Sequence, residues 1–378
     1  MIAERARRLH ADAIVVDGHA DTISRFLDDG EDLGVETSKG HIDLPRMARG
    51  GLDCQFMSCW VEPKYVERGQ SATRALRMID AVKRWISAHP DRIALARTAA
   101  DVRRAAAAGK VCGVLCIEGG HAIQDDLALL RAFHELGVRY MTLTWNNSTS
   151  WAHAARAAGP DTGLSPFGRE VVREMNRIGM LVDLSHVSEK TFYDAIETST
   201  VPVIASHSCA RALCDHPRNL RDEQLRALAK NGGVVGVNFY SGFLSQPFYD
   251  GKKTIDRADD EARAAVRATY RDDPARMDAE LKKVSRAYDA NEAGMARPPL
   301  DVLLRHIEHM VRVAGVDHVG LGSDFDGVTA LPDGIDDCRD LPRLTEGLLD
   351  RGFSEVDVRK ILGENFLRVM EASIDSRS

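Results

Sequence analysis

The sequence predicts a (β/α)8 barrel, the TIM-barrel fold. Short apolar, β-branched runs recur along the 378 residues, and segments of helical length separate most of them. Polar residues that can bind metals or transfer protons follow five of these runs directly. The active sites of such barrels lie at the carboxyl ends of the strands, so this placement fits a barrel with one site at its mouth.

Eight runs are predicted to be buried parallel strands, because a strand that is covered on both faces is continuously apolar. They span residues 13–16, 55–61, 111–117, 139–144, 180–184, 201–205, 234–239 and 318–322. Amphipathic segments of helix length lie between them, at 72–87, 127–136, 166–178, 188–197 and 222–230. The repeated alternation favours a closed barrel, with an open doubly wound sheet as the alternative, since periodicity does not show closure.

Residues 241–299 interrupt the alternation, since they are rich in charge and contain no strand-like run. We expect a helical insertion after the seventh strand, with one long helix at 255–290, which is either a solvated excursion or a lid over the barrel mouth. Near the C-terminus, Ser354 begins a sequence like a capping box, so a short helix is expected toward Leu362. Gly363 would end that helix before a final one.

The composition excludes several kinds of partner. The formal net charge is -7 and the 50 lysines and arginines are scattered, so no nucleic acid is expected to bind. The N-terminus does not resemble a signal peptide, no apolar run reaches membrane-spanning length, and the C-terminus is polar, so we expect a cytoplasmic protein without a membrane anchor. Seven cysteines without a C-x-x-C pair indicate reduced thiols.

Histidines and carboxylates follow four of the predicted strands. His19 and Asp21 are two residues apart, a spacing that directs both side chains to one face of an extended backbone. Glu118 ends an apolar run, where a carboxylate needs a partner, either a cation or an arginine. His186 and His207 follow the fifth and sixth runs. These residue types suit zinc or a similar divalent ion, and the two oxygens of Glu118 could bridge two ions.

Two similar features are interpreted differently. His41 and Asp43 repeat the H-x-D spacing, but no apolar strand precedes them and Pro45 follows, so a turn is expected. His121 follows two glycines that leave the direction of its side chain open, and it is not included among the ligands.

Asp324 is the best candidate for a general acid and base. It stands beyond the last predicted strand, where a carboxylate beside an activated water could take up a proton and deliver it to a leaving nitrogen. Asp326 is interpreted as a turn or helix-capping residue. Because His19 and Asp324 must meet at one barrel mouth, we expect residues 1–378 to form a single domain.

Nine short motifs extend over nearly the whole chain, from about Val15 to Met370. They are DGHAD at 17–21, HIDLPR at 41–46, IEGGH at 117–121, GLSPFG at 163–168, LVDLSHVS at 181–188, SHS at 206–208, RN at 218–219, VNFY at 237–240 and GSDFDGV at 322–328. Together they resemble the membrane dipeptidase (renal dipeptidase) family of zinc peptidases, peptidase family M19, in the amidohydrolase superfamily.

The resemblance implies a barrel of the metal-dependent hydrolase type that holds two zinc ions per chain and hydrolyses dipeptides with a hydroxide that bridges the metals. Matched to the motifs of the family, the ligands of one zinc would be His19, Asp21 and Glu118, and those of the other Glu118, His186 and His207. A homodimer is a further implication of the resemblance.

The resemblance also assigns roles around the metals. Arg218 matches the arginine that binds the free C-terminal carboxylate of the substrate, and its planar guanidinium suits that task. From its sequence context alone, Arg218 would be a surface charge. Asp324 matches the carboxylate that moves the proton from the attacking hydroxide to the departing amine. Tyr240 matches a tyrosine near the site.

Trp145 departs from the pattern of the family. Well-studied members place at this position a histidine that polarises the scissile carbonyl. Here a zinc ion alone would have to do so, or His153, eight residues further on, would reach the substrate, or the substrate is not an ordinary dipeptide.

Three functions are therefore considered. The leading hypothesis is a zinc-dependent dipeptidase, with L-D dipeptides among its candidate substrates. The alternative is another binuclear hydrolase of the amidohydrolase type, acting on N-acyl amino acids, cyclic amides, lactones or phosphoesters. The third is a catalytically silent barrel that binds a ligand or a partner.

Overall fold

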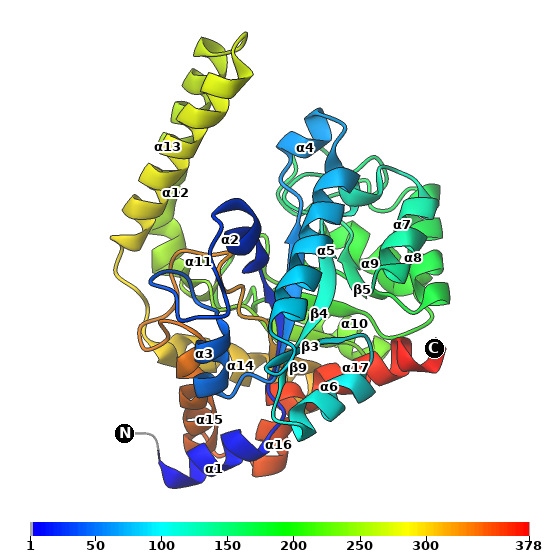
Figure 1. Ribbon diagram of the computed structural model, residues 1–378, viewed down its shortest axis with the longest axis vertical. Coiled ribbons are helices and arrows are strands. Elements are labelled where there is room, and N and C mark those ends of the chain that lie inside the picture. The colour runs from blue at the N-terminus through cyan, green and yellow to red at the C-terminus, as the bar shows by residue number, and fades with distance from the viewer. Residues whose placement is uncertain (1–2, 378) are drawn as a thin grey trace.

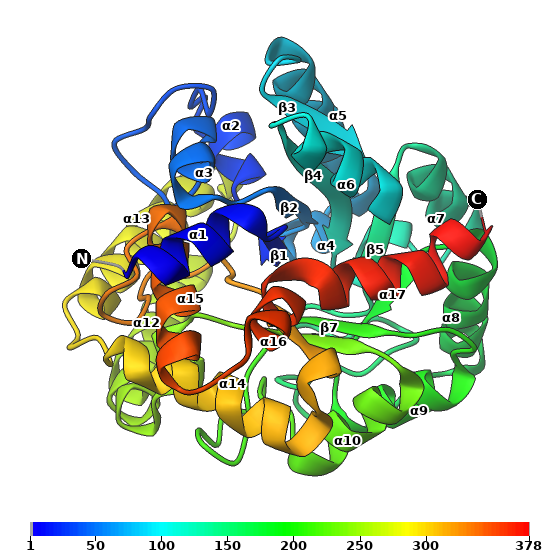
Figure 2. The same cartoon turned by 90° about the horizontal axis from the view of Figure 1, so that it is seen from below.

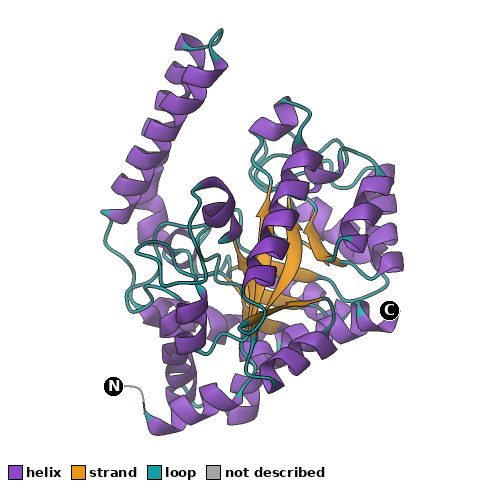
Figure 3. Ribbon diagram, viewed as in Figure 1, coloured by secondary structure: helices purple, strands orange, loops and turns teal. Residues whose placement is uncertain are grey.

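The computed structural model describes residues 3–377, and its central feature is a closed barrel of parallel strands (Figure 1, Figure 3). The strands of the ring are β1 (Val16–Ala20), β2 (Cys54–Trp60), β4 (Val111–Glu118), β5 (Val138–Thr142), β6 (Leu181–Asp183), β7 (Ile204–Ser208), β8 (Val234–Val237) and β9 (Val319–Leu321). β1 pairs with both β2 and β9, and β2 pairs with β4, which closes the ring. The predicted barrel is confirmed and the open sheet is excluded.

β3 (Ile93–Ala96) is an additional strand that the sequence did not predict. It pairs with β4 from Val111 to Val114, whereas β5 pairs with β4 from Leu115 onward. β3 therefore extends the sheet beside the first half of β4 without opening the ring. It has only four residues, two of them alanines, so its apolar signal is weak.

Helices surround the barrel (Figure 1, Figure 2). Outside residues 241–299 they are α1 (Glu4–Asp12), α2 (Ile23–Asp28), α3 (Leu44–Gly50), α4 (Lys64–Glu67), α5 (Ser71–Ala88), α6 (Ala99–Ala107), α7 (Leu127–Glu135), α8 (Pro166–Ile178), α9 (Glu189–Thr198), α10 (Asp222–Asn231), α14 (Leu300–Ala314), α15 (Leu341–Asp350), α16 (Glu355–Arg359) and α17 (Asn365–Ser373). α8 shows how local sequence sets their limits. Ser165 caps it by accepting a hydrogen bond from the Gly168 amide, and Gly179 ends it in the left-handed conformation.

The insertion forms a helical hairpin rather than one long helix. It contains α11 (Ser241–Leu244), α12 (Gln246–Thr269) and α13 (Pro274–Ala293), and the last two project together from the barrel (Figure 1). The expectation of a single helix at 255–290 is wrong, because Asp273 caps a new helix by accepting a hydrogen bond from the Arg276 amide. Pro274 follows at the first position of α13, where its fixed φ suits a helix start.

The C-terminal helices differ from the prediction at one glycine. Ser354 begins α16 as expected, and its hydroxyl accepts a hydrogen bond from the Asp357 amide. Gly363, however, does not end a helix, because residues Lys360–Glu364 form a π-helical turn that continues into α17. Gly363 lies against the chain that leads into β1, where a Cβ atom would come within 2.2 Å of the Ile14 carbonyl oxygen.

We expect Gly363→Ala to lower the free energy of unfolding by about 1–3 kcal/mol, because the added methyl group must displace backbone on one side. Gly294→Ala is the matched control, since a Cβ there would meet its nearest atom at 3.4 Å, an ordinary contact. Urea denaturation of both variants measures the effect. A loss for Gly363→Ala no larger than that of the control would contradict this account of the packing.

All seven cysteines are buried and free of disulfide bonds, as the sequence predicted. Across residues 3–377, none of the helices combines the length and the apolar character needed to cross a membrane.

Candidate active site

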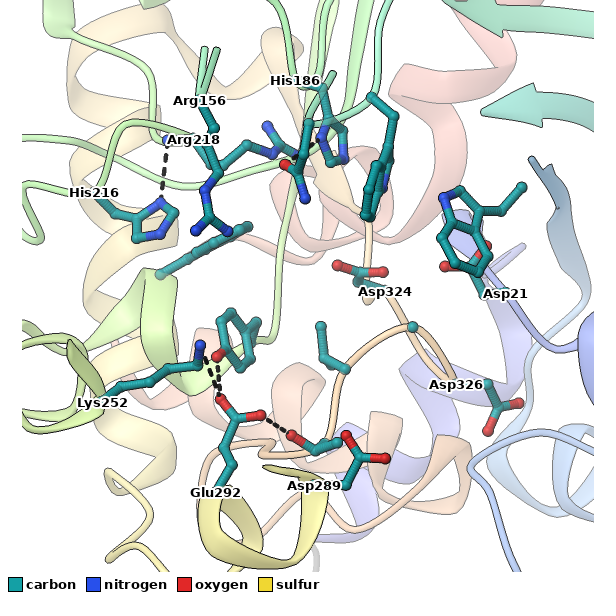
Figure 4. Close-up of a pocket in the computed structure, with 18 of the residues that line it drawn as sticks. Asp21, Arg156, His186, His216, Arg218, Lys252, Asp289, Glu292, Asp324 and Asp326 are labelled. Carbon is teal, nitrogen blue, oxygen red and sulfur yellow. Dashed lines mark hydrogen bonds and ion pairs between the residues drawn. The ribbon is translucent and has the colours of Figure 1, made fainter. Parts of the chain in front are cut away.

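A cavity of about 320 Å³ lies at the carboxyl ends of the strands (Figure 4). Barrel strands and the loops that follow them supply most of its walls, including Asp21, Trp60, Glu118, Trp145, Asn146, His186, Arg218, Tyr240 and Asp324. The insertion lines the remainder with Phe243, Tyr249, Lys252, Asp256, Tyr288, Asp289 and Glu292. The end of the hairpin that is nearest the barrel thus forms part of the cavity wall.

The five predicted metal ligands lie together around Glu118. One carboxylate oxygen, Oε2, lies 3.6 Å from His19 Nε2, and that nitrogen lies 3.8 Å from Asp21 Oδ2. The other oxygen, Oε1, lies 2.8 Å from His186 Nε2 and 3.4 Å from His207 Nε2. Each oxygen of Glu118 therefore faces one of the two ligand groups derived from the sequence, as a bridging carboxylate would.

The three histidines are held in matching orientations. Their Nδ1 atoms lie 2.7 Å from the Tyr140 hydroxyl in His19, 2.8 Å from the Ser206 hydroxyl in His207, and 3.2 Å from Asn146 Oδ1 in His186. The two hydroxyls donate their own protons elsewhere, to the Gly18 carbonyl and to Asp183. With a cation bound, each Nδ1 would therefore carry the proton and each Nε2 would present its lone pair on the side of Glu118.

This arrangement fits divalent cations. The Nε2 atoms of His186 and His207 are only 3.0 Å apart, and a cation between them and the carboxylate would satisfy both lone pairs. On the other side, His19 Nε2 and Asp21 Oδ1 are buried atoms without a hydrogen-bond partner in the described structure. Imidazole nitrogens and carboxylate oxygens are ligands that zinc and related ions accept. The donor set is thus complete on both sides of Glu118.

The surroundings shift the pKa of Glu118 and of the three histidines among the predicted ligands. Burial, followed by the charge of Asp21, raises the pKa of Glu118 to about 7. Burial also lowers the pKa values of His186 and His207 well below the ordinary value, assisted by Arg218 and His19. Two imidazoles are therefore neutral at neutral pH, which is the form that binds a metal. For His19, burial lowers the pKa, but the neighbouring Glu118 and Asp21 carboxylates outweigh burial. The net result is a pKa well above the ordinary value of histidine.

Asp183 is a residue of the site that the sequence reasoning did not single out. Its Oδ1 accepts hydrogen bonds from the Ser185 and Ser206 amides, and its Oδ2 accepts one from the Ser206 hydroxyl. Ser185 and Ser206 directly precede His186 and His207. One buried carboxylate thus fixes the backbone ahead of two predicted ligands. It could have been suspected from its place in the LVDLSHVS motif.

Asp324 is buried beside the ligands and lines the cavity. Asn238 Nδ2 donates a hydrogen bond of 2.9 Å to Asp324 Oδ2, and burial raises the pKa of the carboxyl group. Its backbone is left-handed, with a φ of 63°, which is a strained conformation for most residues. His186, with a φ of 70°, shares this conformation.

Asp326 and His41 have structural surroundings, as the sequence suggested. Asp326 accepts hydrogen bonds from the Thr22 hydroxyl, the Arg25 guanidinium and the His41 amide. Asp43 caps α3 by accepting a hydrogen bond from the Arg46 amide. These contacts fix loops around the mouth of the barrel.

Arg218 is not a surface charge, in contrast to the expectation from its sequence context. It is 3% exposed and lines the cavity, with its guanidinium over the Phe243 ring. Its Nη2 donates a long hydrogen bond of 3.4 Å to the His207 carbonyl oxygen, and its Nε has no partner. Burial lowers its pKa to about 10. Within residues 3–377 no carboxylate pairs with this cation, so it is available to an anionic ligand.

Two other sequence candidates differ in position. Tyr240 lines the cavity, and its hydroxyl donates a hydrogen bond to Glu292 of the insertion. His153 is not among the lining residues, and its ring Nδ1 lies 3.5 Å from the Ser148 hydroxyl. His121, left out of the ligand set, lies with Nε2 2.7 Å from the Val61 carbonyl oxygen.

Trp145 forms part of the cavity wall beside the predicted metal ligands. Its ring stacks on that of His186, with the centroids 6.2 Å apart, and contacts the Trp60 ring. Trp145 and Trp60 thus form an aromatic wall beside His186.

Comparison with known proteins points to one family. The family model for membrane dipeptidases, peptidase family M19, matches residues 3–377. Dipeptidase AC, described as a metallo peptidase of family M19, is 31% identical, with a TM-score of 0.78 over 96% of this chain and 99% of that chain. A metallo peptidase from Rhodobacter sphaeroides, solved with a phosphinate mimic of the dipeptide L-Ala-D-Ala, is also 31% identical, with a TM-score of 0.78 over 96% and 100%. The probable dipeptidase PvdM from Pseudomonas aeruginosa is 25% identical, with a TM-score of 0.84 over 99% and 98%.

Proposed function

The chain belongs to the membrane dipeptidase family, peptidase family M19, and is a metal-dependent dipeptidase; we propose that it uses two zinc ions held by the five ligands around Glu118. The observation that carries this proposal is the division of the Glu118 oxygens between two donor groups, His19 with Asp21 and His186 with His207. Zinc bound there would supply Lewis-acid chemistry that activates water and polarises the substrate carbonyl.

The residues of the chain define how a dipeptide would lie. Arg218 is a buried, unpaired guanidinium, so it would take the free carboxylate of the substrate. The scissile amide would then lie between Arg218 and the ligands, beside Asp324. Asp324 would accept the proton of the attacking water and return it to the amine nitrogen as the C–N bond breaks. The L-Ala-D-Ala mimic bound to the Rhodobacter sphaeroides enzyme supports a dipeptide with a D residue in second position as a substrate class.

Trp145 and His153 bear on how the carbonyl is polarised. Because the His153 ring lies near Ser148 and does not line the cavity, we propose that no histidine at position 145 or 153 polarises the carbonyl; a metal held by the five ligands would supply this polarisation. The single domain, the cytoplasmic location and the homodimer stay predictions from the sequence.

The test of the substrate orientation is Arg218→Met. We expect kcat/KM for L-Ala-L-Ala and L-Ala-D-Ala to fall by about 10²–10³, chiefly through KM, because a buried carboxylate would lose its only cationic partner. Steady-state kinetics of zinc-loaded protein measures the change. Arg226→Met, which removes an exposed arginine of α10, is the control and should match the unsubstituted enzyme.

A C-terminally amidated dipeptide provides the second arm. It should be a poor substrate for the unsubstituted enzyme and an equally poor one for Arg218→Met. The amidated dipeptide has no carboxylate that could pair with the Arg218 guanidinium, so removing the guanidinium should change little. Efficient cleavage of the amide by the unsubstituted enzyme would contradict the role of Arg218 and favour the wider amidohydrolase substrates.

A further inference from the structure

A second arginine, Arg156, lines the cavity close to Arg218. It belongs to the loop between β5 and α8, and its side chain is exposed at the cavity. Across the described residues, its guanidinium makes neither an ion pair nor a hydrogen bond. Figure 4 shows Arg156 with Arg218 and His216 along one wall, away from Asp289 and Asp326.

The third cation of the cavity is already neutralised. Lys252 of α12 lies 2.5 Å from Asp256 and 3.8 Å from Glu292, both of which line the cavity too. Asp326 is likewise paired, with Arg25 at 3.1 Å. Among the described residues, Arg156 and Arg218 are therefore the two cavity lysine or arginine side chains without an ion-pair partner.

Two neighbouring guanidinium groups carry like charges and repel each other. Each also offers several N–H donors in a planar array that suits a carboxylate. A ligand that places two carboxylates on this wall would relieve the repulsion and satisfy both groups. A ligand with one carboxylate would leave one of the cations unpaired.

Within the proposed function, the free C-terminal carboxylate of a dipeptide supplies one of these anions, and Arg218, being buried, is its partner. The second anion must come from a group a few bonds away. Among the standard amino acids, only the side chains of aspartate and glutamate provide a carboxylate so close to the main-chain one. Arg156 lies at the exposed end of the same wall, where a side chain of the C-terminal residue would reach.

We propose that Arg156 is a specificity-determining residue that selects dipeptides with aspartate or glutamate as the C-terminal residue. This inference rests on the proposed dipeptidase function and on the binding of the main-chain carboxylate by Arg218. It adds a substrate class that the family membership does not specify.

The experiment compares Ala-Asp, Ala-Asn and Ala-Ala, each with an L or a D second residue, on zinc-loaded enzyme. Asparagine has the shape of aspartate without its charge, so the Asp-to-Asn ratio of kcat/KM reports the charge alone. We expect a preference for Ala-Asp of about tenfold or more, as for a hydrogen-bonded ion pair. The preference should decrease as the salt concentration rises, because the pair is partly exposed.

Two variants assign the preference to Arg156. Arg156→Met should bring kcat/KM for Ala-Asp down to the value for Ala-Asn, and Arg156→Glu should make Ala-Lys a better substrate than Ala-Asp. Arg173→Met removes an exposed arginine of α8 outside the cavity and should keep the preference. Since Arg156 is exposed, neither variant is expected to impair folding.

The outcomes separate the two proposals. Equal rates for the three dipeptides, or a preference for Ala-Asp that survives in Arg156→Met, would overturn this inference and leave the dipeptidase function intact. Absence of hydrolysis of any dipeptide by zinc-loaded enzyme would overturn both.

Discussion

Glu118→Gln is expected to lose bound metal and to lower kcat/KM for dipeptides by a factor of about 10³ or more. Glutamine keeps the shape of the side chain but replaces one carboxylate oxygen with an NH₂ group, which cannot bind a cation. Loss of a residue that merely supports a ligand already lowers metal affinity about 10–100-fold. Glu118 contacts both ligand groups directly, so its replacement should weaken both sites.

Metal analysis of dialysed protein and steady-state kinetics measure this effect together. Glu135→Gln, an exposed residue at the end of α7, is the matched control and should keep the metal content and activity of the unsubstituted protein. Glu118→Gln that still binds two ions per chain, with unchanged activity, would show that the bridging arrangement is wrong.

Stability distinguishes loss of metal from loss of fold. Burial raises the pKa of Glu118, so without metal the carboxylate is a cost to the folded state, and glutamine removes that cost. With a chelator present, Glu118→Gln should therefore unfold at a temperature no lower than that of the unsubstituted protein. In the presence of zinc, only the unsubstituted protein should gain stability, by linkage between binding and folding.

The sequence identified the candidate ligands because parallel strands are continuous apolar runs, and the polar residues after them meet at one end of a barrel. The strand limits were less well predicted. The first strand was expected at 13–16, but β1 is Val16–Ala20 and contains His19, while β7 contains His207. Polar residues are tolerated inside these strands because partners satisfy them: Tyr140 of β5 contacts His19, and Ser206, the neighbouring residue on β7, contacts His207.

Other features depended on contacts that no local pattern contains. Arg218 lies in the loop after β7 and is buried against Phe243, which comes from the insertion after β8. The hairpin is a different case, since Asp273 and Pro274 are a helix-start signal that the sequence does contain. The segments before and after Asp273 are both charged and helical in periodicity, so the sequence was interpreted as one continuous helix.

Asp324→Asn is expected to lower kcat by about 10²–10⁴ while KM changes little, because the proposed proton transfer acts in the reaction step rather than in binding. Asparagine is the appropriate substitution, since it tolerates the left-handed backbone that Asp324 adopts, whereas alanine would add strain. In Asp324→Asn, the carbonyl oxygen of the new asparagine side chain can still accept the hydrogen bond that Asn238 Nδ2 donates. Kinetics at saturating L-Ala-D-Ala measures kcat directly.

The metal content of Asp324→Asn decides between two roles that kinetics alone does not separate. Asp324 lies close enough to His19 and Asp21 for the three to form a cation site of their own. If Asp324 were a ligand, its replacement would remove metal along with activity, as for Glu118→Gln. If it moves a proton, the variant should keep its full metal content and lose only turnover.

Asn238→Ala provides the intermediate case. It leaves the Asp324 carboxylate in place but removes the hydrogen bond that favours the charged form of that carboxylate. It should therefore lower kcat less than Asp324→Asn does and leave the metal content unchanged.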